Sequence, residues 1–222
     1  MTDPQSTAML QIDLMVAGHD PGPIDGVAGP RTGAALRAFQ AAHGVPADGI
    51  AGRRTQRLLA STPPWMRRAA RLIGKRERAG AADNPVILGW ARALGLAYAG
   101  DNVPWCGLFV AHCLACALPG AALPATPLWA RSWARFGEAS GPLPGAIMVF
   151  RRDAGSGHVG FHAGETHDAY RILGGNRGDG VSLAWLAKAR LLSSRWPAGA
   201  PLPMARPALA VRQTGALSTN EG

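Results

Sequence analysis

The chain has 222 residues, of which 47% are hydrophobic and 17% charged, a composition that excludes an intrinsically disordered protein. Its 23 Lys and Arg residues outnumber 14 Asp and Glu residues, and the net charge of +9 indicates an anionic partner: nucleic acid, a membrane surface or an anionic polymer. No run approaches the roughly 18 apolar residues of a membrane span. The first 20 residues open with an acidic residue and have neither a basic N-terminal region nor a long apolar core. We therefore expect no signal peptide and a cytoplasmic protein.

Two related turns organise residues 1–60. Asp25–Thr32 reads DGVAGPRT and Asp48–Thr55 reads DGIAGRRT. Asp-Gly favours a tight turn, and in each copy a helix can begin near the threonine. Because apolar residues at helical spacing follow the first threonine and also occupy residues 6–17, the pattern predicts a unit of three helices.

The composition changes at Ser61–Pro64, which reads STPP and indicates a short, stiff linker. Two helices are expected after it, WMRRAARLIGKRER and NPVILGWARALGL, and Asp83 or Asn84 can cap the second one. The expected strands are Ala146–Phe150, His158–Gly164, Tyr170–Leu173, Val181–Leu186 and Leu191–Trp196.

These patterns predict an α+β protein made of a small three-helix bundle followed by helices packed on an antiparallel sheet. We expect the bundle over residues 1–60, the linker over 61–64, the second domain over 65–197 and a mobile tail over 198–222.

Cys106 is the first candidate for chemistry. It lies in PWCGLFVAHC, between a Pro-Trp pair and the first apolar turn of a helix expected to run through Ala117. The exposed amides of a helix N-terminus stabilise a thiolate, and they can also hold the oxyanion of a tetrahedral intermediate. We therefore predict that Cys106 is a nucleophile, with its own amide and a group from Asp101-Asn102 as oxyanion donors.

A base and an orienting residue follow later in the chain. His158 begins an expected strand after a glycine, so its ring can face a cleft, and Asn176 ends the next expected strand. An asparagine oxygen can accept the second N–H of the imidazole and fix the orientation of the ring. His162, four residues beyond His158 and on the same strand face, could contact substrate or simply pack, and Asp179 is a weaker candidate than Asn176 for the orienting role.

A metal site is a competing interpretation of the cysteines. Cys106, Cys113 and Cys116 cluster with His112, and these are zinc-ligand types. In a single helix, however, Cys106 and Cys113 share a face while His112 points elsewhere. We therefore expect no metal and no organic cofactor, with Cys113 and Cys116 as small buried residues.

Two resemblances to known families add to these predictions. The paired DG(V/I)xGxxT turns flanking ALRAFQAAHG resemble the peptidoglycan-binding module of many wall hydrolases. Further along, PWCGLFVAHC, LWARSWARFG, PGAIMVF, GHVGFHAGE and ILGGNRGDGVS resemble the cysteine peptidases and amidases of the CHAP and NlpC type, which have a papain-like fold, and more narrowly a phage and prophage subgroup.

By position, the second resemblance implies Cys106 as nucleophile, His158 as base and Asn176 as the polar third residue. Some CHAP enzymes have a glutamate two residues before that asparagine, where this chain has Gly174, so a triad is implied rather than four residues. The two resemblances together imply a monomeric, endolysin-like hydrolase of a cell-wall amide, released to the wall with a holin. A catalytically silent wall-binding protein and an acyl transferase are the alternatives. Nucleic acid and stable membrane insertion are not expected.

Overall fold

The structure, a computed structural model, describes residues 4–60, 62–78, 83–153, 155–203 and 217. The helices are α1 (Pro4–Val16), α2 (Pro30–Ala42), α3 (Arg53–Leu59), α4 (Pro64–Ala70), α5 (Pro85–Ala93) and α6 (Cys106–Ala117), with 3₁₀ helices η1 (Ala130–Arg135) and η2 (Lys188–Arg190). The strands are β1 (Glu138–Ala139), β2 (Ile147–Arg151), β3 (Gly157–Glu165), β4 (Ala169–Gly174), β5 (Ser182–Ala187) and β6 (Leu191–Trp196).

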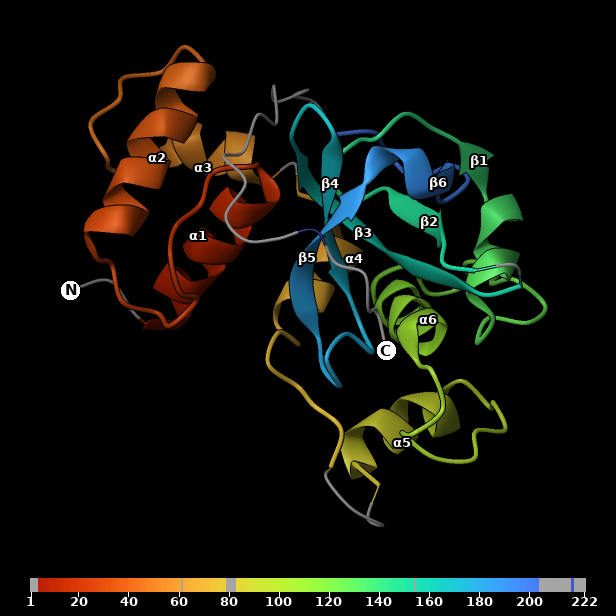
Figure 1. Cartoon of the computed structure of the whole chain (residues 1–222). Helices are drawn as coiled ribbons and strands as arrows, with labels where there is room; N and C mark the ends of the chain where they lie inside the picture. Colours follow the sequence, from red (N-terminus) through yellow and green to blue (C-terminus); the bar gives the residue numbers. More distant parts are fainter. Residues whose placement is uncertain (1–3, 61, 79–82, 154, 204–216, 218–222) are drawn as a thin grey trace.

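The strands form one antiparallel sheet in the order β1-β6-β2-β3-β4-β5. Helices α4 and α6 pack against each other and against β3 and β4, whereas α1, α2 and α3 gather to one side of the sheet (Figure 1). The α+β prediction, with helices and an antiparallel sheet, is therefore confirmed.

The helix expected from Trp65 onwards is much shorter than the pattern indicated. It ends at Ala70, and the chain then turns at Gly74, whose φ of 85° belongs to the left-handed region. Beyond this turn Arg76 pairs with Gly180 in an isolated β-bridge. By contrast, Asn84 caps α5 as expected, because its side chain accepts a hydrogen bond from the Val86 amide at 2.9 Å.

The first Asp-Gly turn is closed by a buried glutamine of α1. The Gln11 side-chain amide donates to Asp25 Oδ1 at 3.0 Å and to the Val27 carbonyl at 3.1 Å. The same nitrogen lies 3.2 Å from Thr32 Oγ1, and Gln11 Oε1 accepts from the Gly26 amide at 3.0 Å. One side chain thus binds the Asp25 carboxylate and two backbone groups of the turn.

The second turn repeats this arrangement around Gln40 of α2. Its amide donates to Asp48 Oδ1 at 2.8 Å, to the Ile50 carbonyl at 2.9 Å and to Thr55 Oγ1 at 3.3 Å. Its oxygen accepts from the Gly49 amide at 2.9 Å. The sequence echo is therefore a structural repeat.

Helix α1 contributes to two hydrophobic cores. Leu14 packs into a small core with Leu36 and Phe39 of α2 and Leu59 of α3. Ile12, Met15 and Val16 instead join the large core that contains the sheet and α6. An all-round apolar helix of this kind is buried on more than one side. The small helical unit therefore shares a helix with the rest of the protein, which was not expected from a bundle and a linker.

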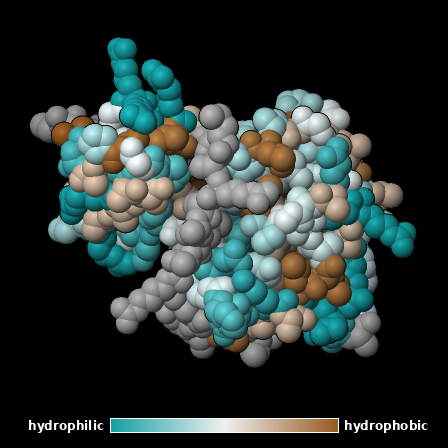
Figure 2. Space-filling view, turned by 90° about the horizontal axis from the view of Figure 1, so that it is seen from above, coloured by the Kyte–Doolittle hydropathy of each residue, from teal (hydrophilic) through white to brown (hydrophobic). Residues whose placement is uncertain are grey.

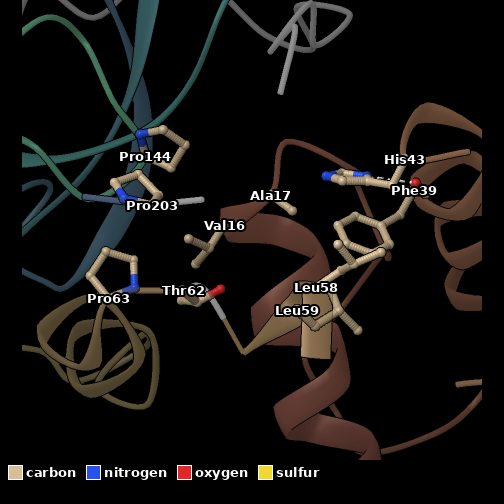
Figure 3. A pocket seen from close by; sticks show the side chains of 10 residues that line it. All are labelled: Val16, Ala17, Phe39, His43, Leu58, Leu59, Thr62, Pro63, Pro144 and Pro203. Carbon is tan, nitrogen blue, oxygen red and sulfur yellow. Dashed lines mark hydrogen bonds between the residues drawn. The ribbon is translucent and has the colours of Figure 1, made fainter. Parts of the chain in front are cut away.

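Polar contacts accompany this shared packing. Arg67 of α4 donates from Nε and Nη2 to the two carboxylate oxygens of Asp13 in α1, at 2.8 and 3.1 Å. Burial raises the pKa of Asp13 to about 6, although the Arg67 charge acts in the opposite direction. Figure 3 shows the adjacent small pocket, where Pro63, Pro144 and Pro203 lie across from α1 and Phe39.

The face seen in Figure 2 is mostly hydrophilic, and hydrophobic residues form separate small patches on it. Among the described residues, no helix has the length and apolarity needed to cross a membrane. Residue 61 of the expected linker and most of the expected tail, residues 204–216 and 218–222, lie outside the described residues.

We expect Met15→Ala to destabilise the sheet-containing part of the protein, although Met15 lies in α1. All seven tryptophans follow residue 64, so tryptophan fluorescence reports on that part alone. Removing a buried methionine side chain should lower the free energy of unfolding by about 2–5 kcal/mol, visible as a lower denaturant midpoint.

Val27→Ala is the control, because that side chain is 64% exposed. A fluorescence transition that is the same in Met15→Ala and the unchanged protein would show that the two parts fold independently.

Candidate active site

Helix α6 is the centre of the candidate site. Residues Cys106–Leu114 are all buried, and the helix packs against α4, α5, β3 and β4. Cys106 is its first residue, as the sequence predicted, and is 4% exposed.

A close backbone contact fixes the N-terminal end of α6. A Cβ added at Gly107 would lie 2.3 Å from the Pro127 carbonyl oxygen and 2.6 Å from that of Leu128. Only glycine fits at this position, and the loop at residues 127–128 therefore lies directly over the start of the helix. The sequence reading missed the reason for this glycine, because the contact joins segments that are distant in the chain.

An open cleft of about 570 Å³ lies at this end of the helix, and Cys106 is part of its wall. Its lining is largely apolar and comes from three parts of the chain: Leu96, Val103, Pro104 and Cys106; residues 125–130; and Arg152, Ser156 and Gly157. Trp129 is 57% exposed at the cleft, and Arg152 is a cation in its lining. The sequence analysis did not single out either residue. A mostly apolar cleft with a few polar groups is typical of a small-molecule or substrate site.

The ionisation of Cys106 differs from the sequence-based expectation. Burial raises the pKa of the Cys106 thiol, while the amides of Val159, Gly107 and Cys106 and the charge of Arg152 lower it. The amides of the helix N-terminus therefore act as predicted, but desolvation outweighs them. Cys106 is accordingly a thiol at neutral pH in the ligand-free protein, and its reaction would need a base.

His158 lies on β3. The Val159 amide that interacts with the Cys106 sulfur directly follows His158 in the chain. The ring of His158 is buried against β4, since a Cβ added at Gly174 would lie 2.7 Å from His158 Nε2. Gly174 thus provides the space that the imidazole occupies, and a glutamate side chain at this position would displace the ring.

Asn176 follows β4 and is buried, with a φ of 56°. In the β3–β4 register Phe161 pairs with Leu173, so the end of β4 that leads to Asn176 lies beside the end of β3 that carries His158. The neighbouring Gly175 lies against Trp105, because a Cβ there would be 2.5 Å from the indole ring. The structure therefore brings the segments that carry the three predicted residues together.

The alternative residues have other surroundings. Asp179 is exposed, and its carbonyl accepts a hydrogen bond from the Glu77 amide at 2.7 Å. The ring of His162 is buried edge-on against Tyr170, and burial lowers its pKa to about 4. The Asp101 carboxylate accepts from the Asn84 amide at 2.7 Å, so it holds the start of α5.

The cysteines and His112 do not converge on one point. His112 stacks on Trp90 and is 2.9 Å from Arg68 Nη2, an arrangement in which the neutral imidazole accepts a hydrogen bond. Burial lowers the pKa of His112 to about 4. Cys113 is buried and Cys116 is exposed, whereas the sequence analysis expected both to be buried. Within the described ranges, no group of three or more His, Cys, Asp or Glu side chains is arranged to hold a metal ion.

Comparison with known proteins concerns the N-terminal part. Residues 4–59 match the family model of a peptidoglycan binding domain. No curated protein and no solved structure was found to match the chain. The match supports cell-wall association and peptidoglycan as a partner.

We expect the rate of Cys106 alkylation by iodoacetamide to rise continuously from neutral into alkaline pH, since burial raises the pKa of the thiol and keeps the thiolate scarce at neutral pH. Peptide mass spectrometry would follow Cys106 separately, with the exposed Cys116 as an internal control for the reagent. Fast labelling of Cys106 that does not change between roughly pH 6 and 8 would instead indicate a preformed thiolate.

Proposed function

We propose that the protein is a peptidoglycan hydrolase that cleaves an amide bond of the cell wall through a thiol mechanism. Cys106 is the nucleophile, His158 the general base and Asn176 the residue that orients the imidazole. The observation that carries the proposal is the placement of Cys106 at the start of α6, in the wall of an open cleft, with its sulfur interacting with the amide next to His158.

The fold is consistent with this proposal. A buried helix with a cysteine at its N-terminus packs on an antiparallel sheet whose β3 and β4 carry the histidine and asparagine segments. This is the arrangement expected of a papain-like hydrolase of the CHAP and NlpC type. The wall-binding domain in the same chain supports a wall substrate independently.

In the proposed mechanism His158 takes the thiol proton as the Cys106 sulfur attacks the carbonyl carbon. The amide of Cys106 at the free end of α6 donates to the developing oxyanion. The C–N bond then breaks, and the imidazolium returns the proton to the leaving amine. A water molecule attacks the thioester with His158 again as base, which releases a carboxylate and regenerates the thiol.

A catalytically silent wall-binding protein is the second candidate, and the burial of Cys106 favours it. A thiol with 4% exposure and a raised pKa reacts slowly unless substrate binding opens or reorganises the site. An acyl transferase would share the first half of the mechanism and differ only in the acceptor of the acyl group.

We expect Cys106→Ser and His158→Ala to lower the rate of sacculus cleavage by roughly 10³-fold or more, because members of a cooperating pair are each needed for the chemistry. Release of soluble muropeptides measures the rate, and circular dichroism confirms the fold. A folded Cys106→Ser protein that cleaves sacculi at the unchanged rate would exclude the thiol mechanism.

Asn176→Ala should reduce cleavage by less than the loss of Cys106, since Asn176 orients the base and does not react. The matched control is Asp179→Ala, because Asp179 also has a positive φ but is exposed. The reverse order of effects would move the orienting role to Asp179.

Gly174→Ala should inactivate the protein while leaving it folded. The added methyl would lie 2.7 Å from His158 Nε2, and displacement of a catalytic group by about 1 Å can reduce the rate roughly 10²-fold. Gly141→Ala is the control, since a Cβ there meets nothing within 4 Å. Full cleavage activity in folded Gly174→Ala would show that the position of this ring is not needed for the reaction.

A further inference from the structure

The cleft at Cys106 contains a cation to which the proposed mechanism gives no role. Among the residues that the structure describes, Arg152 is the only charged residue in the lining of this cleft, and its side chain is exposed. The other lining residues are uncharged and mostly apolar, and none of them is acidic. The cleft therefore presents a positive charge to a bound molecule in surroundings that offer little other charge.

The acidic residue next to Arg152 in the chain is not part of the cleft lining. Asp153 Oδ1 accepts hydrogen bonds from the Ser156 amide at 3.0 Å and from the Ser156 hydroxyl at 2.5 Å. A guanidinium has five N–H donors, so Arg152 can bind a carboxylate of a ligand in addition to its contacts within the protein. A carboxylate matches this donor pattern with two parallel, charge-assisted hydrogen bonds.

A second arginine holds the backbone near Arg152 in place. Arg131 of η1 donates from Nε to the Ser156 carbonyl and from Nη2 to the Asp153 carbonyl, both at 2.8 Å. Its side chain also lies against Gly157, where an added Cβ would be 3.1 Å from Arg131 Cγ. Arg131 directly follows the cleft residues 125–130, so it ties that wall to the one that carries Arg152. A wall fixed in this way is ready before a ligand arrives, which lowers the entropy cost of binding.

Arg152 also lies near the proposed nucleophile. Its positive charge lowers the pKa of the Cys106 thiol, although burial has the larger and opposite effect. Because such an interaction weakens with distance, a group bound to Arg152 lies close to the bond that Cys106 attacks.

We propose that Arg152 is a specificity-determining residue, which binds a free carboxylate of the substrate close to the scissile amide. The inference deepens the proposed hydrolase function and rests on it, since the site is the same. The stem peptide of peptidoglycan contains an acidic residue whose carboxyl group occurs either free or as a primary amide. The protein should select the free carboxylate, because a primary amide is uncharged and cannot accept two charge-assisted bonds from one guanidinium.

Two soluble muropeptides that differ only in this carboxyl group, free or amidated, test the inference. We expect the unchanged protein to cleave the free form with a kcat/KM about tenfold higher than that of the amidated form. Arg152→Gln should abolish this preference by slowing cleavage of the free form alone.

Arg151→Gln is the matched control. It removes the same charge from an exposed arginine one position earlier, at the end of β2, and Arg151 is not in the cleft lining. This variant should keep the preference. Circular dichroism checks the fold of both variants, and the preference of the unchanged protein tests the inference without any substitution.

Binding is measured separately from cleavage, by calorimetry of the full chain with Cys106→Ser and each muropeptide. We expect the same preference for the free carboxylate, lost when Arg152→Gln is added. If this preference is found while the protein with Cys106 intact cleaves neither muropeptide, the carboxylate site stands and the proposed hydrolase function fails.

Three results would overturn the inference. The first is equal binding and equal cleavage of the two muropeptides by the unchanged protein. The second is an Arg152→Gln protein that is slowed equally on both, since the charge would then act only through the Cys106 thiol. The third is an equal loss of preference in Arg151→Gln, which would assign the effect to net charge.

Discussion

The burial of α6 on every side is the constraint on which the candidate site depends. Because residues Cys106–Leu114 are enclosed, Cys106 can meet a substrate only at the N-terminal end of the helix. Gly107 lets the loop at residues 127–128 lie against that end, and the same loop forms a wall of the cleft. The burial that positions Cys106 also raises its pKa, so the site combines an accurately placed sulfur with the need for a neighbouring base.

The wall-binding part is joined to this core by packing as well as by the chain. Helix α1 carries Leu14 into the small core and Met15 into the large one, and the Asp13–Arg67 ion pair lies at the same contact. A domain attached only by a flexible linker raises the local concentration of an enzyme near its substrate. A packed domain additionally sets the orientation of the cleft relative to the bound wall.

Local signals in the sequence predicted local structure well. Asp-Gly defined both turns, Asn84 defined the start of α5, and the Pro-Trp pair placed Cys106 at the start of α6, because these features depend on neighbouring residues. Features that depend on distant residues could not be predicted. The helix after Trp65 ends at Ala70, and the chain then reaches the bridge between Arg76 and Gly180. The raised pKa of Cys106 follows from its burial. The need for Gly174 appears only when β4 lies against His158.

The central claim is that Cys106 attacks an amide of the wall and that water completes the reaction. Mass spectrometry of muropeptides released from sacculi in heavy-oxygen water tests this claim most directly. The account predicts products with one new amine and one new carboxyl group, the carboxyl carrying a single heavy oxygen atom from the hydrolysis of the thioester. Products with intact amides, whether from glycan cleavage or from no cleavage at all, would contradict it.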